Sequence, residues 1–185
     1  MIQMPQASDL LIAPPHMTDK RFHKAVIMIT HHNTGGTFGL CLNKPTEHTM
    51  QDILEETGIE GNVNFPLYWG GPVNPTTVWM LHDSGWECDG TVKINNEWSM
   101  TSNLAMFQHL ADGDTPTNFR MFFGFSSLAQ GQLKAELRGI EPWSHKHSWL
   151  VAENPGPEWI METPVEDLWI ASTDLCSHQA VDSWL

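Results

Sequence analysis

The sequence predicts an α+β protein in which strands outnumber helices. Short apolar or β-branched segments alternate with turn signals along most of the 185 residues. The few segments with helical spacing are placed irregularly between them, without the regular strand–helix alternation of a parallel sheet. Hydrophobic residues make up 41% of the chain, so a full core is available. We expect one domain over residues 1–185, with an acidic C-terminal extension at residues 173–185.

Strands are expected where apolar or β-branched runs end at glycine, proline or asparagine. Residues 25–30 are apolar on both faces, which is typical of a strand buried on both sides. The turn at residues 31–36 contains asparagine and glycine, which tolerate positive φ, so a hairpin should join residues 25–30 to residues 37–42. The other expected strands cover residues 10–13, 67–69, 78–82, 92–94, 98–101, 119–125 and 149–152.

Helices are expected over residues 49–58 and 130–138, and over a segment that Ser102 or Asn103 can cap and that ends at Ala111. The first of these begins with a capping box, Thr49 and Asp52, and ends at Gly58, which can adopt the left-handed conformation. Residues 163–166 form a second capping box, with proline at the first helical position, and therefore predict a helix start. Ser177 is expected to cap a final short helix.

The charge of the chain argues against polyanionic partners. There are 22 acidic and 9 basic residues, which gives a formal net charge of −13 at pH 7. A protein that follows nucleic-acid phosphates needs lysine and arginine to displace counterions, and only Lys20, Arg21 and Lys24 cluster here. Direct nucleic-acid binding and binding to anionic membranes are therefore disfavoured. With no visible secretory signal and no apolar run near the roughly 18 residues that span a bilayer, we expect a cytoplasmic protein without a membrane segment.

Ten histidines and three cysteines invite a search for a metal site. The sequence offers the pairs His31-His32 and His145-Lys146-His147, but no motif with zinc-ligand spacing. We therefore expect no metal and no other cofactor. Residues 124–128 have the strand-to-helix setting of a nucleophile elbow, but leucine stands where the pattern requires glycine, so an ordinary turn is favoured over a serine hydrolase.

Several short motifs follow one another in a fixed order along the chain. They are Leu11-Ile12-Ala13-Pro14-Pro15, His32-Asn33 with Gly36 and Gly39, Leu42-Asn43-Lys44-Pro45, Gly70-Gly71-Pro72-Val73, and Gly131-Gln132-Leu133 with Glu136-Leu137. Together they resemble the AlgH/YqgE family of small bacterial cytoplasmic proteins, which are often named transcriptional regulators. The resemblance implies an α+β fold with a branched, antiparallel, barrel-like β-sheet flanked by several α-helices. One departure is that residues 125–129 lack the tryptophan that the family has before its Gly-Gln-Leu motif.

The resemblance and the lack of a complete catalytic constellation favour a non-catalytic regulatory or binding protein. It would act indirectly, through a protein partner or a small-molecule ligand. A ligand pocket is expected where polar residues at strand ends adjoin glycine-rich turns. The candidate ligand-binding residues are His32, Asn33, Asn43, Gly70, Gly71 and His82.

Two alternatives remain open at this point. The side chains of Asn33 and Asn43 can instead satisfy local backbone amides. The chain can also be a histidine-dependent hydrolase, with or without a metal, which requires His32 and His82 to converge within about 3 Å of a common point. The oligomeric state, the ligand and the regulated process are left open by the sequence.

Overall fold

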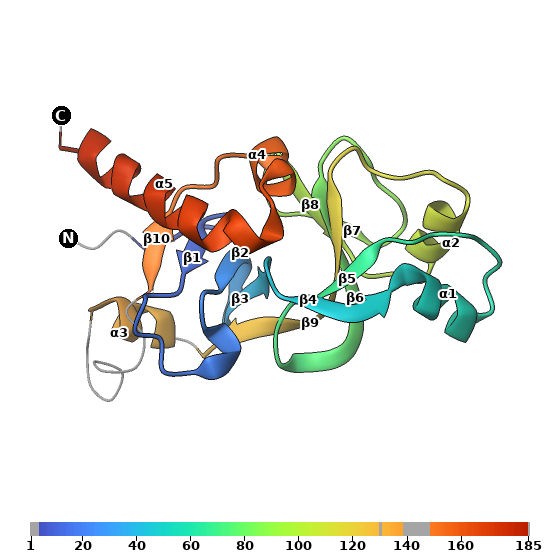
Figure 1. Cartoon of the computed structure of the whole chain (residues 1–185), viewed down its shortest axis with the longest axis horizontal. Helices are drawn as coiled ribbons and strands as arrows, with labels where there is room; N and C mark the ends of the chain where they lie inside the picture. Colours follow the sequence, from blue (N-terminus) through green and yellow to red (C-terminus); the bar gives the residue numbers. More distant parts are fainter. Residues whose placement is uncertain (1–3, 130, 139–148, 185) are drawn as a thin grey trace.

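The computed structural model describes residues 4–129, 131–138 and 149–184. Within these residues ten strands form one sheet, and eight of them follow one another along its main path (Figure 1). In spatial order these are β10 (Leu150–Ala152), β1 (Leu10–Ile12), β2 (Val26–Asn33), β3 (Gly36–Cys41), β9 (Phe119–Leu128), β6 (Val73–Asp83), β8 (Trp98–Thr101) and β7 (Thr91–Lys93).

The sheet branches at β9. This strand pairs with β3 and β6, and also with β5 (Pro66–Trp69), which in turn pairs with β4 (Pro45–Thr49). The β5–β9 pair is parallel, and the other pairs of the described strands are antiparallel. The predicted α+β class and the branched, barrel-like, largely antiparallel sheet are thus confirmed.

Helices pack on both faces of the sheet and at one end. In chain order they are the 3₁₀ turn η1 (Lys20–Phe22), α1 (Met50–Thr57), α2 (Ala105–Ala111), α3 (Gln132–Arg138), α4 (Pro157–Glu162), the 3₁₀ turn η2 (Val165–Asp167) and α5 (Leu168–Asp182). Helices α4 and α5 lie over one face of β1 and β2, whereas α3 lies on the opposite side (Figure 1). Helices α1 and α2 lie together at the far end of the molecule.

Alternate residues of the central strands belong to two separate hydrophobic cores. Even-numbered residues such as Leu10 and Met28 pack with Ile160 and Leu168 of α4 and α5. Odd-numbered residues such as Ile29 pack with the opposite core, which includes residues of α3. Because successive strand side chains point to opposite faces, both faces of β1 and β2 are buried, as the apolar run at residues 25–30 predicted.

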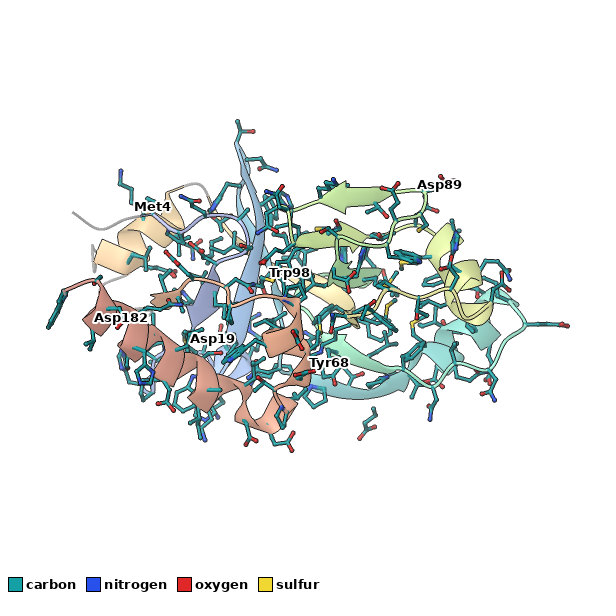
Figure 2. The ribbon with its side chains drawn as sticks, turned by 90° about the horizontal axis from the view of Figure 1, so that it is seen from above. Met4, Asp19, Tyr68, Asp89, Trp98 and Asp182 are labelled. Carbon is teal, nitrogen blue, oxygen red and sulfur yellow. The ribbon has the colours of Figure 1, made fainter. Side chains whose placement is uncertain are left out.

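A third core joins α1 and α2 to β5, β6 and β9. Its fully buried members include Met50, Leu54, Leu67 and Met80. Trp98 of β8 is also fully buried, within the core beneath α4, and lies near the middle of the molecule in Figure 2. The sheet is therefore covered by packed side chains along most of its length.

Several element boundaries differ from the sequence prediction. Strand β9 is longer than expected because it continues past its predicted end to pair with β3, and β6 begins earlier than expected, where Val73 pairs with Phe125 of β9. Helix α4 was not predicted: no helix was expected directly after the strand at residues 149–152, but Pro157 stands in the first turn of this helix. The separate helix expected from Ser177 is wrong, since residues 177–182 continue α5 without a break. None of the helices in the described ranges has the length and apolar character needed to span a bilayer.

Candidate ligand-binding site

A pocket of about 210 Å³ lies between the sheet and helix α3. One wall is formed by β1, β2, β3 and β9, and the other by η1, α3 and the residue before β10. We call this cavity the α3 pocket. The described residues that line it are Leu11, Asp19, Arg21, Phe22, Ile27, Ile29, Thr37, Phe38, Gly39, Pro72, Ser126, Ser127, Leu128, Gln132, Glu136 and Trp149.

Gly39 lines the α3 pocket on the sheet side and has no side chain to project into it. It is the cross-strand partner of Ile29 on β2 and of Ser126 on β9. A Cβ atom on Gly39 would lie 2.7 Å from Ile27 Cγ2 and 2.7 Å from the Met28 carbonyl oxygen, which is too close for either contact. Glycine is therefore required here, and with the small Ser126 beside it the wall leaves room for a ligand.

The fully buried carboxyl group of Glu136 sits in the opposite wall. Its Oε2 accepts a hydrogen bond from Trp149 Nε1 at 2.8 Å, and its Oε1 accepts one from Gln132 Nε2 at 2.8 Å. Gln132 Oε1 in turn accepts the backbone N–H of Ala129 at 3.0 Å. Because Gln132 and Glu136 are four residues apart, they share one face of α3. This chain of hydrogen bonds ties α3 to the end of β9 and to the approach to β10.

The η1 side of the pocket carries both signs of charge. Arg21 donates from Nε and Nη2 to the two carboxylate oxygens of Asp19, at 3.1 and 2.8 Å. These hydrogen bonds raise the pKa of Arg21. Next to them, the Phe22 ring meets the Trp149 ring edge-on with centroids 6.0 Å apart. A ligand here would meet a polar pair and an aromatic wall together.

The lining combines apolar side chains with carboxylate and hydroxyl groups. Among the described lining residues there is no histidine or cysteine that could serve as a base or a nucleophile. The hydroxyl of Ser126 donates to the Gly70 carbonyl at 3.0 Å, and Ser126 lies inside β9 rather than on a sharp turn, so the nucleophile elbow is not formed. The pocket can hold a small molecule with an apolar body and a polar end.

Three of the predicted site residues lie just behind this pocket. His32 Nδ1 is 3.0 Å from the hydroxyl of Thr37, which lines the cavity. The Gly70 carbonyl accepts from Ser126 and also from the Cys41 N–H at 2.9 Å. Gly71 passes so close to β9 that a Cβ atom would lie 2.1 Å from the Phe125 carbonyl carbon. His32 and the Gly70-Gly71 bend are thus adjacent to the α3 pocket but do not line it.

The two predicted asparagines hydrogen-bond to the backbone. Asn33 Oδ1 accepts the N–H of Gly35 at 2.6 Å within the hairpin turn. Asn43 Oδ1 accepts the N–H of Val26 at 2.9 Å, and its Nδ2 donates to the carbonyl of Lys24 at 2.8 Å. The Asn33 contact is the local backbone contact that the sequence offered as the alternative to ligand binding, whereas the backbone partners of Asn43 lie 17 and 19 residues away along the chain.

His82 is fully buried between β6 and β8. Its Nδ1 donates to the Asp83 carbonyl at 2.7 Å, so in the neutral ring Nε2 accepts from the hydroxyl of Thr101 at 2.9 Å. The hydroxyl of Thr91 lies 2.8 Å from that of Thr101, and Thr91 Oγ1 accepts the Cys88 N–H at 3.0 Å. Burial lowers the pKa of His82, partly opposed by its contact with Asp83.

The convergence of His32 and His82 that a hydrolase requires is not found. His32 pairs with Thr37 of β3, and Thr37 in turn pairs with Leu128 at the end of β9. His82, by contrast, pairs with Phe119 at the start of β9. The two ends of this ten-residue strand are roughly 30 Å apart in an extended chain. The structure therefore does not bring the two imidazoles to a common point.

The sequence did not single out the polar residues of the pocket itself. Gln132 and Glu136 were noticed only as parts of a family motif, and a glutamate on a short helix is usually solvated. Trp149 was assigned to a strand. The available signal was the four-residue spacing of Gln132 and Glu136 on a helix that follows a buried strand, but their partner at position 149 is not visible from local spacing.

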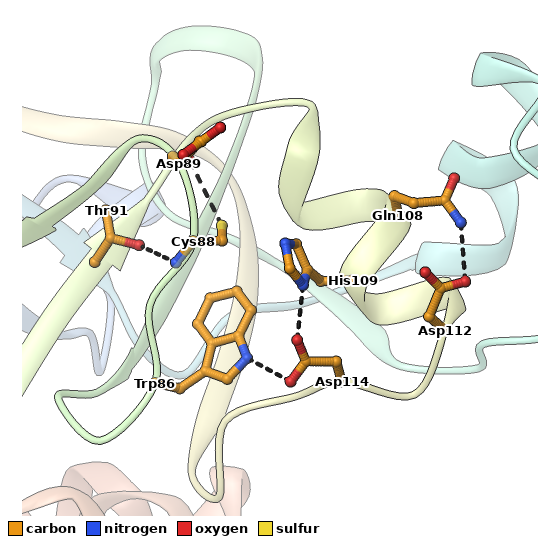
Figure 3. A network of polar contacts seen from close by, with 8 residues as sticks. All are labelled: Trp86, Cys88, Asp89, Thr91, Gln108, His109, Asp112 and Asp114. Atoms are coloured by element: carbon orange, nitrogen blue, oxygen red, sulfur yellow. Dashed lines mark hydrogen bonds and ion pairs between the residues drawn. The ribbon is translucent and has the colours of Figure 1, made fainter.

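A second polar network lies at the far end of the molecule (Figure 3). Trp86 Nε1 donates to Asp114 Oδ1 at 2.9 Å, and His109 Nδ1 is 2.7 Å from Asp114 Oδ2. Both hydrogen bonds lower the pKa of Asp114, and the one with His109 has the larger effect. The Trp86 ring also meets the His82 ring edge-on, at a centroid distance of 5.2 Å. The network joins the loop before β7 to the end of α2.

Histidine, cysteine and carboxylate side chains do not form a metal-binding group of three or more in the described part of the chain. The predicted pair His145 and His147 lies outside the described residues. All three cysteines are unpaired, and only Cys41 is buried.

A branched, half-barrel sheet with helices on both faces and a pocket under α3 defines the class of protein, an α+β domain. The comparisons are more specific. The model of the AlgH-like family DUF179 matches residues 10–180, so the chain belongs to this family.

Relatives and solved structures agree with that assignment. A UPF0301 protein of Methylococcus capsulatus is 30% identical over 173 residues, covering 91% of this chain and 88% of that protein. A UPF0301 protein of Xanthomonas campestris is 29% identical over the same length and coverage. The solution structure of the AlgH protein from Pseudomonas aeruginosa is similar with a TM-score of 0.74 and 26% identity, covering 95% of this chain and 92% of that one. A crystal structure of a protein from Corynebacterium diphtheriae shares the fold, with a TM-score of 0.69 at 24% identity and coverage of 91% and 86%.

Proposed function

We propose that this protein is a non-catalytic regulator that binds a small amphipathic molecule in the α3 pocket. The observation that carries the proposal is the combination of an apolar sheet wall with the buried Glu136 carboxyl group, held by Gln132 and Trp149. Pockets of this kind, apolar with a few fixed polar groups, are the usual sites for small molecules.

The size and lining of the pocket limit the ligand. A volume of about 210 Å³ is below the roughly 300–1,000 Å³ of sites for drug-sized molecules, so the ligand is smaller than those. Its apolar body would pack on Leu11, Ile27 and Ile29. Its polar end would approach the Asp19–Arg21 pair, where both a donor and an acceptor are present.

A ligand in this position would contact two separate elements, η1 and α3, and would thereby favour one relative placement of them. We propose that a protein partner recognises that placement in the cytoplasm. The net charge of −13 supports an indirect effect on transcription rather than contact with DNA. The three unpaired cysteines are consistent with a reducing compartment.

The predicted site residues act as supports in this proposal. His32 orients Thr37, and the Gly70-Gly71 bend orients Ser126 through its carbonyl group. Asn33, Asn43 and His82 position the backbone around the hairpin and around β6. No described contact of His82 reaches the α3 pocket, so no ligand contact is assigned to it.

The test is a pair of tryptophan substitutions. Leu128→Trp fills the α3 pocket from β9, whereas Leu104→Trp places the same side chain at an exposed position before α2. Each protein is produced in its native host and purified, and small molecules released on denaturation are identified by mass spectrometry. We expect a compound that accompanies the wild type and Leu104→Trp but falls about tenfold or more with Leu128→Trp.

Two results would contradict the proposal. One is a compound retained equally by Leu128→Trp when circular dichroism shows that this variant is folded. The other is the absence of any retained compound together with an unchanged melting temperature of the wild type in a small-molecule extract of the host. The second measurement matters because a bound ligand stabilises the folded state in proportion to its concentration over Kd.

A further inference from the structure

Arg120 is a buried cation that has no anionic partner in the part of the chain that the structure describes. It lies on β9, its side chain is 8% exposed, and its cross-strand partner on β6 is the fully buried Leu81. Among the described residues no carboxylate lies within 4.0 Å of its guanidinium group. Buried charges are normally paired, since an unpaired one is costly to remove from water.

The contacts that Arg120 does make are neutral. Nη1 donates to the Leu42 carbonyl at 2.7 Å, and the guanidinium carbon lies 4.8 Å from the centroid of the Tyr68 ring. The carbonyl and the aromatic face offset part of the desolvation cost and hold the planar group in place. Burial lowers the pKa of Arg120, and Tyr68 partly opposes this. The guanidinium group retains N–H donors beyond the one used by Leu42.

Arg120 also lines a cavity of about 220 Å³ that is separate from the α3 pocket. Its other walls are apolar or aromatic and include Phe65, Tyr68, Phe119, Met121 and Met161. Met161 comes from α4, and Figure 2 shows Tyr68 beside that helix. A positively charged group that is held rigidly at the side of an apolar cavity is suited to an anion with an apolar body.

We propose that this cavity, the Arg120 pocket, binds a small organic monocarboxylate. The carboxylate accepts hydrogen bonds from the free N–H groups of Arg120, and the apolar or aromatic body packs against Tyr68, Phe65 and Met161. A planar carboxylate matches the fork of a guanidinium group. A phosphate ion carries close to two charges and more acceptor oxygens than this single cation can satisfy, which favours the carboxylate.

The chain contains one tyrosine, and it forms part of this pocket. Protein labelled with 3-fluorotyrosine therefore gives a single ¹⁹F resonance that reports directly on the Arg120 pocket. The probe is benzoate, and its matched control is benzamide, which has the same shape without the charge. We expect benzoate to shift the resonance saturably in the millimolar range and benzamide to bind at least about tenfold more weakly.

Three variants test whether the benzoate-induced shift depends on Arg120. Arg120→Met should abolish the benzoate shift, whereas Lys93→Met, which removes an exposed cation on β7, should leave it unchanged. Leu128→Trp, which fills the other pocket, should also leave it unchanged, so this proposal can fail or hold independently of the proposed function. If Arg120→Met does not fold, the comparison of benzoate with benzamide on the wild type decides alone.

Four outcomes would overturn the inference. Equal binding of benzamide would show that the charge is irrelevant. An equal shift with inorganic phosphate would indicate a general anion site rather than a carboxylate site. A benzoate shift that persists in folded Arg120→Met, or no shift in the wild type, would remove the role of Arg120.

Discussion

Trp149 donates its indole N–H to Glu136 across 2.8 Å and so joins the residue before β10 to helix α3. Both groups are buried, and the second carboxylate oxygen is occupied by Gln132. The wall of the α3 pocket is therefore held by a carboxyl group whose two oxygens both act as acceptors.

Replacing that carboxyl group by an amide should weaken the fold. In Glu136→Gln one oxygen becomes an NH₂ group, so either Trp149 or Gln132 faces a donor instead of an acceptor. A buried hydrogen bond that is lost in this way costs about 1–3 kcal/mol. We expect urea denaturation to show a lower midpoint for Glu136→Gln and an unchanged midpoint for Glu158→Gln, an exposed position on α4. Equal midpoints would contradict the buried network.

The requirement for glycine at the pocket wall can be tested separately. Gly39→Ala forces a methyl group against Ile27 and the Met28 carbonyl, and overpacking of this kind costs about 1–3 kcal/mol. Gly85→Ala is the control, because its nearest neighbour, Asp83 Oδ1, would be 3.5 Å away. The thermal midpoint should fall for Gly39→Ala only, and a stable Gly39→Ala protein would argue against the close packing of β2 and β3.

His82 should make stability depend on pH. Burial holds its pKa in the folded protein below the ordinary value of 6.5. Below pH 6.5 the His82 side chain of the unfolded chain therefore binds a proton. In the folded protein the same side chain stays neutral until the pH falls to its lower, folded-state pKa. The free energy of unfolding consequently falls as the pH drops through this window, by up to about 1.4 kcal/mol per pH unit.

We expect His82→Gln to unfold more easily than the wild type at pH 7.5 but to lose less stability between about pH 6.5 and 5. His178→Gln, which alters an exposed histidine on α5, should keep the wild-type slope. The measurement is urea denaturation across the pH range. Parallel slopes for His82→Gln and the wild type would show that this histidine is not held neutral.

Cys41 should be protected from an alkylating reagent that reaches the other two cysteines. Burial raises the pKa of Cys41 to about 12, whereas Cys88 and Cys176 are partly exposed. Because the thiolate is the reactive form, Cys41 should remain unmodified by iodoacetamide in the folded protein. Peptide mass spectrometry checks this, with protein unfolded in urea as the control in which all three react. Early modification of Cys41 would contradict its place in the core between β3 and α3.

Local patterns in the sequence predicted the strands better than their arrangement. Residues 25–30 are apolar on both faces, and the structure confirms that residues 26–30 of β2 are buried on both sides. The branch of the sheet was implied by family resemblance only, because β9 pairs with segments that are far away along the chain. Local periodicity does not contain such pairings.

The pocket was harder to predict for a related reason. Polar residues next to glycine turns were taken as its lining, yet Asn33 bonds to the backbone of its own turn and Asn43 bonds to the backbone at the start of β2. The buried carboxyl group came from Glu136, whose partner is thirteen residues further along the chain. Whether a glutamate is solvated or enclosed depends on what folds over it, and neighbouring residues in the sequence do not determine that.

Because β2 has a hydrophobic core on each side, burial alone does not determine how this strand is aligned with its neighbours. Sliding β2 by one residue would exchange the side chains facing α3 for those facing α5, and since both sets are apolar the exchange would lose little burial. Asn43 grips the peptide groups of Val26 and Lys24, where the strand begins. The Asn43 side chain thus favours one of two pairings that bury similar apolar side chains, which hydrophobic burial alone would distinguish poorly.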